Sequence, residues 1–448
     1  MSQRQSSNKP FDVIGVGFGP SNLALAIALE EQAETAGRRA HSLFLDRQTD
    51  YHWHGDTLVS QSELQISFLK DLVTLRNPTS RYSFVNYLQQ HGRLIDFINL
   101  GTFYPCRMEY SDYLRWVAGH FSEQCAYGNR VERVEPVVGN DGNIELLDVI
   151  SVDSQGREHR RRTRSVVVGT GGTPRIPAVF KGLRDDGRVF HHSQYLSRIT
   201  QQRCARGEPM RIAVVGGGQS AAEAFIDLND SYPNVRVDLI LRSEVLKPAD
   251  DSPFVNQIFA PENTHLFFNQ PESERERLIS EFHNTNYSVV DLNLIEQIYG
   301  ILYRQKVSQR VRHAFRCRTQ VQSANAGEHG IRLHLRDVAT GQEEAQHYDA
   351  VILATGYERK SHKALLAPLA QYLGEFDVER SYRVRATPNL KAGVFVQGFS
   401  EANHGLSDTL LSVLPARAWE ISEALLDMAE ASEHGHLELL DNVLSASA

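Results

Sequence analysis

Cysteine is scarce in this chain. Its 448 residues contain only four, and none of them form a C-x-x-C or C-x-x-x-x-C pair: Cys106, Cys125, Cys204 and Cys317. This scarcity excludes a fold organised by disulfides and argues against a zinc knuckle. We therefore expect a protein of the reducing cytoplasm, and we predict no metal site.

Long apolar runs and an excess of positive charge are also absent. No apolar stretch approaches the ~20 residues that a membrane helix needs, and the polar start MSQRQSSNKP lacks the apolar segment of a secretion signal. Lysine and arginine number 47 against 55 aspartates and glutamates, which gives a net charge of −8. An acidic chain has no general electrostatic reason to bind nucleic acid. We expect neither nucleic acid nor a membrane as a partner.

The length and the order of the sequence patterns predict two or three domains. Two strand–glycine–helix units are present. Between them, residues 131–169 alternate short β-runs with the turn signals Asn140-Asp141-Gly142 and Ser154-Gln155-Gly156. Residues 272–310 are predicted to be helical, and residues 415–431 have the apolar spacing of an amphipathic helix.

The first glycine motif, FDVIGVGFGPSN at residues 11–22, joins an apolar strand to a helix. Gly15 permits the tight turn, and Gly17 lets the backbone approach a pyrophosphate at the helix N-terminus. Gly19 follows, and Pro20 replaces the last glycine of the pattern at a place where its missing N–H costs nothing. The next strand ends at Asp46, where a carboxylate would meet a ribose. The motif predicts a dinucleotide site; the alternative is a tight turn without a ligand.

The second glycine motif, RIAVVGGGQSAA at residues 211–222, repeats this pattern. Gly216, Gly218 and Ala221 occupy its three positions. The following strand ends at Arg242, a base where the first unit has an acid. Arginine pairs with a 2′-phosphate by charge-assisted hydrogen bonds, so NADPH is predicted over NADH. The alternative is that Arg242 is a solvated strand end.

A third pattern, D-x-x-x-L-A-T-G-Y-x-x-x-x-H, runs from Asp349 to His362. It contains an apolar strand at 350–354 followed by small residues that allow close passage of a backbone. By its chemistry alone it could be any strand end. We expect this strand and the C-terminal helix to return to the first domain and complete it.

Together these motifs resemble the flavin-dependent N-hydroxylating monooxygenases, and above all the bacterial L-ornithine N-hydroxylases of the pyoverdine pathway type. Lysine N6-hydroxylases are related to them. The resemblance extends from about residue 11 to about residue 430. It rests on the A-T-G-Y pattern and on the segments at residues 15–22, SQSELQISFLKDL at 60–72, RNPTS at 76–80, NLG at 99–101, NYS at 286–288 and GLSDTLLS at 405–412.

The resemblance implies an α/β fold with two Rossmann-like dinucleotide-binding domains, for FAD and NADPH, and a small, mostly helical substrate-binding region. The FAD domain would comprise residues 1–175 and 346–448, including the C-terminal helix. The NADPH domain would comprise 176–250 and 310–345. Residues 251–309 would form the helical region.

The resemblance also implies the site residues. Besides the first glycine motif, FAD would contact Asp46, Trp53, His54, Gln65, Val131, Thr409, Leu410 and Leu411. NADPH would contact Gly217, Gly218, Gln219, Ser220, Arg242, Asn286, Tyr287 and Ser288. The amino acid would contact Lys70, Asn256, Gln257, Ile258, Phe259, Asn286 and Ser412. Lys70 and Asn286 are the candidates closest to the chemistry.

These candidate site residues also have alternative structural interpretations. Lys70 could extend its ammonium to water from an apolar stretch. Asn256 could be a turn residue. Asn286 and Ser412 could cap helices. Trp53 lies between two histidines, but no carboxylate or cysteine completes a metal site, so packing near the flavin is expected.

The implied reaction is hydroxylation by O2 of the side-chain amine of L-ornithine, giving N5-hydroxyornithine for hydroxamate siderophores. Lys70 suits the carboxylate end of the substrate, and Asn286 is a candidate hydrogen-bond acceptor for the amine. The amine must be neutral, and removing its proton at pH 7.5 costs roughly 4 kcal/mol for a pKa of about 10. The family also implies a homo-oligomer, often a tetramer.

Four competing functions remain to be weighed. A flavin disulfide reductase needs a redox cysteine pair, which this sequence lacks. A Baeyer–Villiger or general amine monooxygenase usually carries F-x-G-x-x-x-H-x-x-x-W-P; Phe180 and Gly182 are present, but no Trp-Pro follows. Lysine hydroxylation stays open, because one methylene is worth only ~1–3 kcal/mol in a pocket. Two glycine motifs together with substrate-type residues count against a non-catalytic NADPH sensor.

Overall fold

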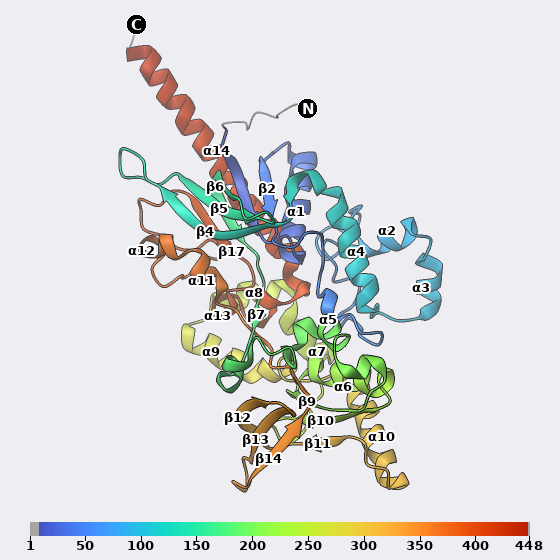
Figure 1. Ribbon diagram of the computed structural model, residues 1–448. Helices are drawn as coiled ribbons and strands as arrows, with labels where there is room; N and C mark the ends of the chain where they lie inside the picture. The colour runs from blue at the N-terminus through green and yellow to red at the C-terminus, as the bar shows by residue number, and fades with distance from the viewer. Residues whose placement is uncertain (1–8, 447–448) are drawn as a thin grey trace.

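The computed structural model describes residues 9–446, with side chains to residue 431. Two largely parallel sheets lie at opposite ends of the molecule, each flanked by helices (Figure 1). This is an α/β fold with two Rossmann-like units. Within the described residues no helix is long and apolar enough to cross a membrane.

The first sheet has the order β3-β2-β1-β6-β5-β4, with β17 beside β6. Strands β1, β2, β3, β6 and β17 are parallel, and β4, β5 and β6 form an antiparallel meander. The meander confirms the β-runs predicted at 131–169. The strand bounds are β1 Phe11–Val16, β2 Ser42–Leu45, β3 Cys125–Ala126, β4 Asn129–Val137, β5 Leu146–Asp153, β6 Glu158–Val168 and β17 Gly393–Val396.

The second sheet is wholly parallel, in the order β11-β10-β9-β15-β8. Its strands are β8 Val189–His191, β9 Met210–Val215, β10 Val235–Ile240, β11 Ala314–Arg316 and β15 Ala350–Leu353. The expected place of the strand at 350–354 was wrong: it pairs with β9 and β8 and does not complete the first sheet. A short, fully buried apolar strand fits the middle of either sheet. The first sheet is completed instead by β17.

Two small sheets accompany these. An antiparallel sheet of β12 Thr319–Gly327, β13 Gly330–Asp337 and β14 Glu343–Tyr348 packs its apolar face on the second sheet. Strands β7 Thr173–Pro174 and β16 Tyr357–Glu358 pair antiparallel. They lie on the two segments where the chain passes from the first sheet to the second and back.

The helices include α1 Pro20–Ala36, α4 Arg107–His120, α6 Gln219–Ser231 and α14 Leu414–Ala446, which follow or cover the sheets. The region predicted to be helical at 272–310 contains two helices with a break between them, α9 Glu272–Phe282 and α10 Leu292–Ser308. The shorter helices are α2 Phe84–Gln90, α3 Leu94–Leu100, α5 Tyr195–Ile199, α7 Pro253–Asn256, α8 Pro261–Phe268, α11 Ser361–Leu365, α12 Ala370–Leu373 and α13 Glu401–His404.

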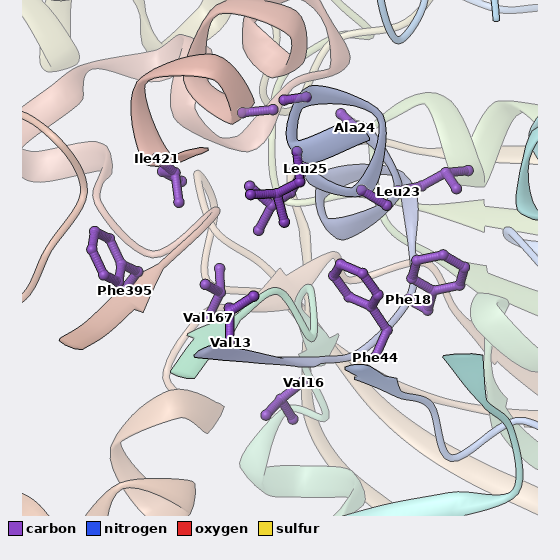
Figure 2. Close-up of a cluster of buried hydrophobic side chains, with 14 of the residues drawn as sticks. Val13, Val16, Phe18, Leu23, Ala24, Leu25, Phe44, Val167, Phe395 and Ile421 are labelled. Carbon is purple, nitrogen blue, oxygen red and sulfur yellow. The ribbon is translucent and has the colours of Figure 1, made fainter. Parts of the chain in front are cut away.

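The largest core lies between the first sheet and the pair α1 and α14. Figure 2 shows Leu25 of α1 and Ile421 of α14 facing Val13, Val167 and Phe395 of the strands. All five side chains are buried. The predicted amphipathic helix at 415–431 is thus confirmed, and its apolar face fixes the C-terminal part of the chain beside the first glycine loop.

Candidate active site

The first glycine loop leaves open space beside its last glycine. A Cβ at Gly15 would overlap the Phe44 ring at 2.3 Å, and Gly17 has a φ of +83° with Gly169 O 2.9 Å from a Cβ placed there. No atom lies within 4 Å of a Cβ at Gly19, which immediately precedes α1. Pro20 is the first residue of that helix. The loop therefore fits a pyrophosphate at a helix N-terminus.

Asp46 holds this loop from the end of β2. Its carboxylate accepts the N–H of Phe18 at 2.7 Å and that of Gln48 at 2.8 Å. The Asp46 carbonyl accepts the N–H of Asn129 at 2.8 Å, which places the start of β4, and with it Val131, beside the loop. Each carboxylate oxygen keeps a further lone pair, so a ribose contact by Asp46 stays a prediction.

Asn22 is a loop-organising residue that the sequence reasoning missed. It is fully buried in the first turn of α1. Its amide donates to Gly17 O at 2.6 Å, and its Oδ1 accepts from Gln397 at 2.8 Å. A buried amide in an otherwise apolar helix turn was the available signal, but its partner lies 375 residues away.

A buried arginine brings the GLSDTLLS segment to the same loop. Arg417 of α14 is 1% exposed and contacts Asp408 Oδ1 at 3.0 Å and Ser21 Oγ at 2.9 Å. Asp408 also accepts the N–H of Ser400 at 2.7 Å. Because Ser21 follows Pro20, this network places residues 409–412 next to the glycine loop. The sequence reasoning did not identify Arg417.

Two predicted substrate residues meet across the chain. Lys70 Nζ donates to Asn256 Oδ1 at 3.1 Å, although the residues are 186 positions apart. Burial lowers the pKa of Lys70. Lys70 therefore does not simply extend into water, and Asn256, the last residue of α7, does more than shape a turn.

The other predicted substrate residues differ in their surroundings. Ser412 is 1% exposed, and its hydroxyl has no hydrogen-bond partner among the described residues. The half-buried Asn286 side chain likewise makes no hydrogen bond within residues 9–446, so neither side chain caps a helix. Gln257 is exposed and Phe259 buried. Ile258 lines a mostly apolar cavity of about 180 Å³, which residues 405–407 also line.

The glycines of the second loop pack closely against neighbouring residues. Gly216 has a φ of +151°, and a Cβ there would lie 2.2 Å from Ala354 O. Gly218 faces Ser288, whose Cα lies 3.7 Å from a Cβ placed on the glycine. Gly217 packs against Leu241. The loop thus brings Ser288 next to the glycines, as a shared contact with NADPH requires.

Among the predicted NADPH residues near this loop, Gln219 is bonded within the protein, whereas Arg242 has no partner within residues 9–446. Gln219 accepts the Asp291 N–H at 2.8 Å and donates to Glu223 at 3.0 Å, so its side chain is engaged within the protein. Ser220 follows it in the first turn of α6. Arg242 is exposed and has no hydrogen bond or ion pair within residues 9–446. Its guanidinium is available to a phosphate.

Tyr287 connects a segment predicted to bind NADPH with a segment predicted to bind FAD. Its hydroxyl donates to Glu401 Oε2 at 2.7 Å and lies 2.6 Å from Thr409 Oγ1. Burial, and then the Glu401 charge, raises the pKa of Tyr287. Thr409 belongs to the predicted FAD set, together with the half-buried Leu410 and Leu411, whereas Tyr287 belongs to the NADPH set.

A buried ion pair also links the two units. Arg107, the first residue of α4, contacts both carboxylate oxygens of Glu223 on α6, at 2.7 Å and 3.1 Å. Glu223 is 3% exposed. Since Gln219 bonds the same carboxylate, the second glycine loop is tied to the first domain. The sequence reasoning missed both Arg107 and Glu223.

Aromatic residues lie between the units. Trp53 packs edge-on against Tyr110 with ring centroids 5.7 Å apart, as expected of a packing residue. His54 adopts a φ of +53° and meets the Tyr357 ring of the A-T-G-Y pattern at 6.5 Å. Surrounding protein, followed by the charges of two arginines, lowers the pKa of His54 to about 4. Gln65 is exposed. Within residues 9–446 no cluster of three metal-binding side chains occurs.

Comparison with known proteins now places the chain. Residues 9–359 match the family described as L-lysine 6-monooxygenase/L-ornithine 5-monooxygenase. The chain is 63% identical over 425 residues to an L-ornithine N(5)-monooxygenase of Pseudomonas aeruginosa, covering 95% of this chain and 96% of the relative.

Two solved structures are similar over most of the chain. Ornithine hydroxylase (PvdA) from Pseudomonas aeruginosa superposes with a TM-score of 0.90 and 62% identity, covering 94% of this chain and 100% of that one. The ornithine N-hydroxylase of Kutzneria sp. 744, with reduced FAD, NADP⁺ and L-ornithine, gives a TM-score of 0.88 and 35% identity, covering 93% and 99%. This chain belongs to the L-lysine 6-monooxygenase/L-ornithine 5-monooxygenase family.

Proposed function

We propose that this protein uses FAD, NADPH and O2 to hydroxylate the side-chain amine of L-ornithine, giving N5-hydroxyornithine for hydroxamate siderophores. The observation that carries the proposal is the contact of Tyr287 with Thr409, 2.6 Å between their oxygens. This contact connects a segment predicted to bind NADPH with a segment predicted to bind FAD. The similarity to ornithine hydroxylases along nearly the whole chain supports the same reaction.

The residues present fit both cofactors. We assign FAD to the unit of the first sheet, where the space beside Gly19 and the N-terminus of α1 would accept its pyrophosphate. We assign NADPH to the unit of the second sheet, where Arg242 is free to pair with a 2′-phosphate. When bound, FAD would accept a hydride from NADPH and activate O2.

The protein's own part is to hold the amino acid and keep its amine neutral. Lys70 gives one N–H to Asn256 and keeps two for the substrate carboxylate. The free hydroxyl of Ser412 is a second contact for the amino acid. The Asn286 side-chain oxygen is the candidate acceptor for an amine proton. Exclusion of water from the site strengthens these contacts. It also favours the neutral amine and so offsets part of the roughly 4 kcal/mol needed to deprotonate it.

An assay with two amino acids and two nicotinamide cofactors tests the proposal. The purified protein with FAD is given ornithine or lysine, each with NADPH or NADH, and hydroxylated product and cofactor oxidation are measured together. We expect product from ornithine with NADPH. Stimulated NADPH oxidation without product would mark lysine as an uncoupling effector. NADPH oxidation without product from either amino acid would contradict the substrate assignment and favour a general amine monooxygenase.

We also propose that the protein forms a homo-oligomer and acts in the cytoplasm. Tyr299, Tyr303 and Val307 recur every four residues along α10 and are 73%, 59% and 68% exposed. An apolar stripe of this kind suits contact with a second copy. All four cysteines are free, which fits a reducing compartment. Light scattering of the wild type and of Tyr303→Glu tests the oligomer: the variant should have a lower mass.

A further inference from the structure

Arg359 lies where the chain returns from the second sheet to the first. It directly follows β16, which pairs with β7 on the outgoing segment. A Cβ placed on Gly398 would be 3.4 Å from Arg359 Nη1. Gly398 comes just after β17, at the carboxyl end of the first sheet. This is the edge at which parallel sheets of this kind bind nucleotides.

Arg359 is partly buried yet has no partner. Within residues 9–446 its guanidinium makes no hydrogen bond and no ion pair. Three nearby carboxylates have other partners. Asp408 pairs with Arg417 at 3.0 Å, Glu401 accepts from Tyr287 at 2.7 Å, and Glu358 faces Arg175 at 3.9 Å. A cation held in partly desolvated surroundings without a counter-ion is costly unless an anion joins it.

The charge of Arg359 reaches residues of both proposed cofactor sites. It counts among the causes that lower the pKa of His54, after burial and Arg107. At Tyr287 it opposes the effects of burial and Glu401, which raise the pKa of that phenol. His54 belongs to the predicted FAD set and Tyr287 to the NADPH set, so the guanidinium charge acts on a residue of each set.

We propose that Arg359 is an anion-binding residue whose ligand is a phosphate group of a bound dinucleotide. Its planar head carries five N–H donors that match the spacing of phosphate oxygens. The phosphate could come from FAD or from NADPH, since Arg359 adjoins both sites. This inference rests on the proposed function and adds to it a contact at the junction of the two units.

Binding measurements on variants test this assignment. Arg359→Ala and Arg359→Lys are compared with Arg175→Ala. Arg175 is a matched control because it directly follows β7, as Arg359 follows β16, but its side chain is 59% exposed and faces Glu358. NADP⁺ is titrated into the oxidised holoenzyme by calorimetry. FAD release from the holoenzyme on dilution is followed by flavin fluorescence.

We expect Arg359→Ala to weaken one of the two dinucleotides by about ten-fold or more, as loss of a charge-assisted hydrogen bond does. Weaker NADP⁺ binding identifies the nicotinamide cofactor as the source of the phosphate, and faster FAD release identifies the flavin. Arg359→Lys should lose less affinity for that dinucleotide. Arg175→Ala should bind both dinucleotides within about two-fold of the wild type.

The inference is overturned if Arg359→Ala binds both dinucleotides within two-fold of the wild type. If Arg359→Ala does not fold, Arg359→Gln and Arg359→Lys are judged by the same criterion: equal binding in both variants overturns the inference, and weaker binding by the glutamine variant supports it. Failure of the wild type itself to bind FAD or NADP⁺ would contradict the proposed function instead.

Discussion

The hydroxyls of Tyr287 and Thr409 lie 2.6 Å apart and form a hydrogen bond between segments 122 residues apart in sequence. Its direction follows from the third partner. Tyr287 gives its only proton to the Glu401 carboxylate, so Thr409 donates to the Tyr287 oxygen. One phenol thus fixes both the loop before α10 and the segment that Arg417 holds against the first glycine loop.

Replacing Tyr287 by phenylalanine should loosen this junction. The change leaves Glu401 without its donor, and we expect the free energy of unfolding to fall by about 1–3 kcal/mol. We also expect less hydroxylated product per NADPH oxidised. Urea denaturation and a paired assay of product and NADPH measure both effects. Tyr372→Phe is the control, because the Tyr372 hydroxyl makes no hydrogen bond within the described residues; equal behaviour of the two variants would refute the role of Tyr287.

Lys70→Ala should act on the amino acid and not on the nucleotides. Loss of a charged hydrogen-bond donor is worth about 1.5–3 kcal/mol, so the KM for ornithine should rise roughly ten- to 150-fold. Asn256→Ala should have a smaller effect because the ammonium remains. Lys306→Ala, exposed on α10, should change nothing. A Lys70→Ala enzyme with weakened NADP⁺ binding and an unchanged ornithine KM would contradict this assignment.

The Arg107–Glu223 pair should be strongly coupled. Glu223→Ala leaves a largely buried guanidinium without its counter-ion, which costs about 3–5 kcal/mol of stability. The double variant Arg107→Ala/Glu223→Ala should recover part of this loss, because it removes the unpaired charge. A double-mutant cycle by urea denaturation measures the coupling. The exposed pair Arg277 and Glu281 on α9 is the matched control and should show little coupling; similar values for both pairs would count against the link between the units.

His404 should make the protein sensitive to acid. Its ring is fully buried on α13, and burial lowers its pKa to about 4, although the nearby Asp408 acts in the opposite direction. An unfolded histidine has a pKa of about 6.5, so the unfolded chain takes up the proton first as the pH falls. The stability that the neutral ring contributes is complete above pH 6.5 and is lost progressively towards pH 4.

Between pH 7.5 and pH 5.5 this loss should be about 1.3 kcal/mol from His404 alone. His404→Gln should reduce the difference in unfolding free energy between these pH values by that amount. Urea denaturation at both pH values makes the comparison. A variant that loses as much stability as the wild type would show that His404 is not the titrating group.

Local patterns carried the sequence predictions that the structure confirmed. Both glycine units, the β-runs at 131–169 and the C-terminal amphipathic helix depend on residues close together in the chain, where backbone geometry and apolar spacing decide the outcome. The strand at 350–353 was assigned to the wrong sheet because sheet membership is decided by distant partners. A buried apolar strand carries no mark of which sheet it joins.

The residues that organise the site were missed for the same reason. Asn22 has its partner Gln397 at the other end of the chain, and Arg417 on a late helix meets Ser21 on the first. Asn22 lies within the first glycine motif, but that motif does not indicate its distant partner, and Arg417 belongs to none of the motifs. Lys70 and Asn256 were chosen only because the resemblance supplied them, and their hydrogen bond emerges only in the folded chain.

The pairing of β7 with β16 gives the molecule a modular architecture. The second unit leaves the first at Thr173–Pro174 and returns at Tyr357–Glu358, and these two points are hydrogen-bonded neighbours. An inserted domain whose ends meet can be exchanged or removed with only a short splice between its neighbours. The second unit can therefore be transplanted between related enzymes, with the splice placed at these two dipeptides.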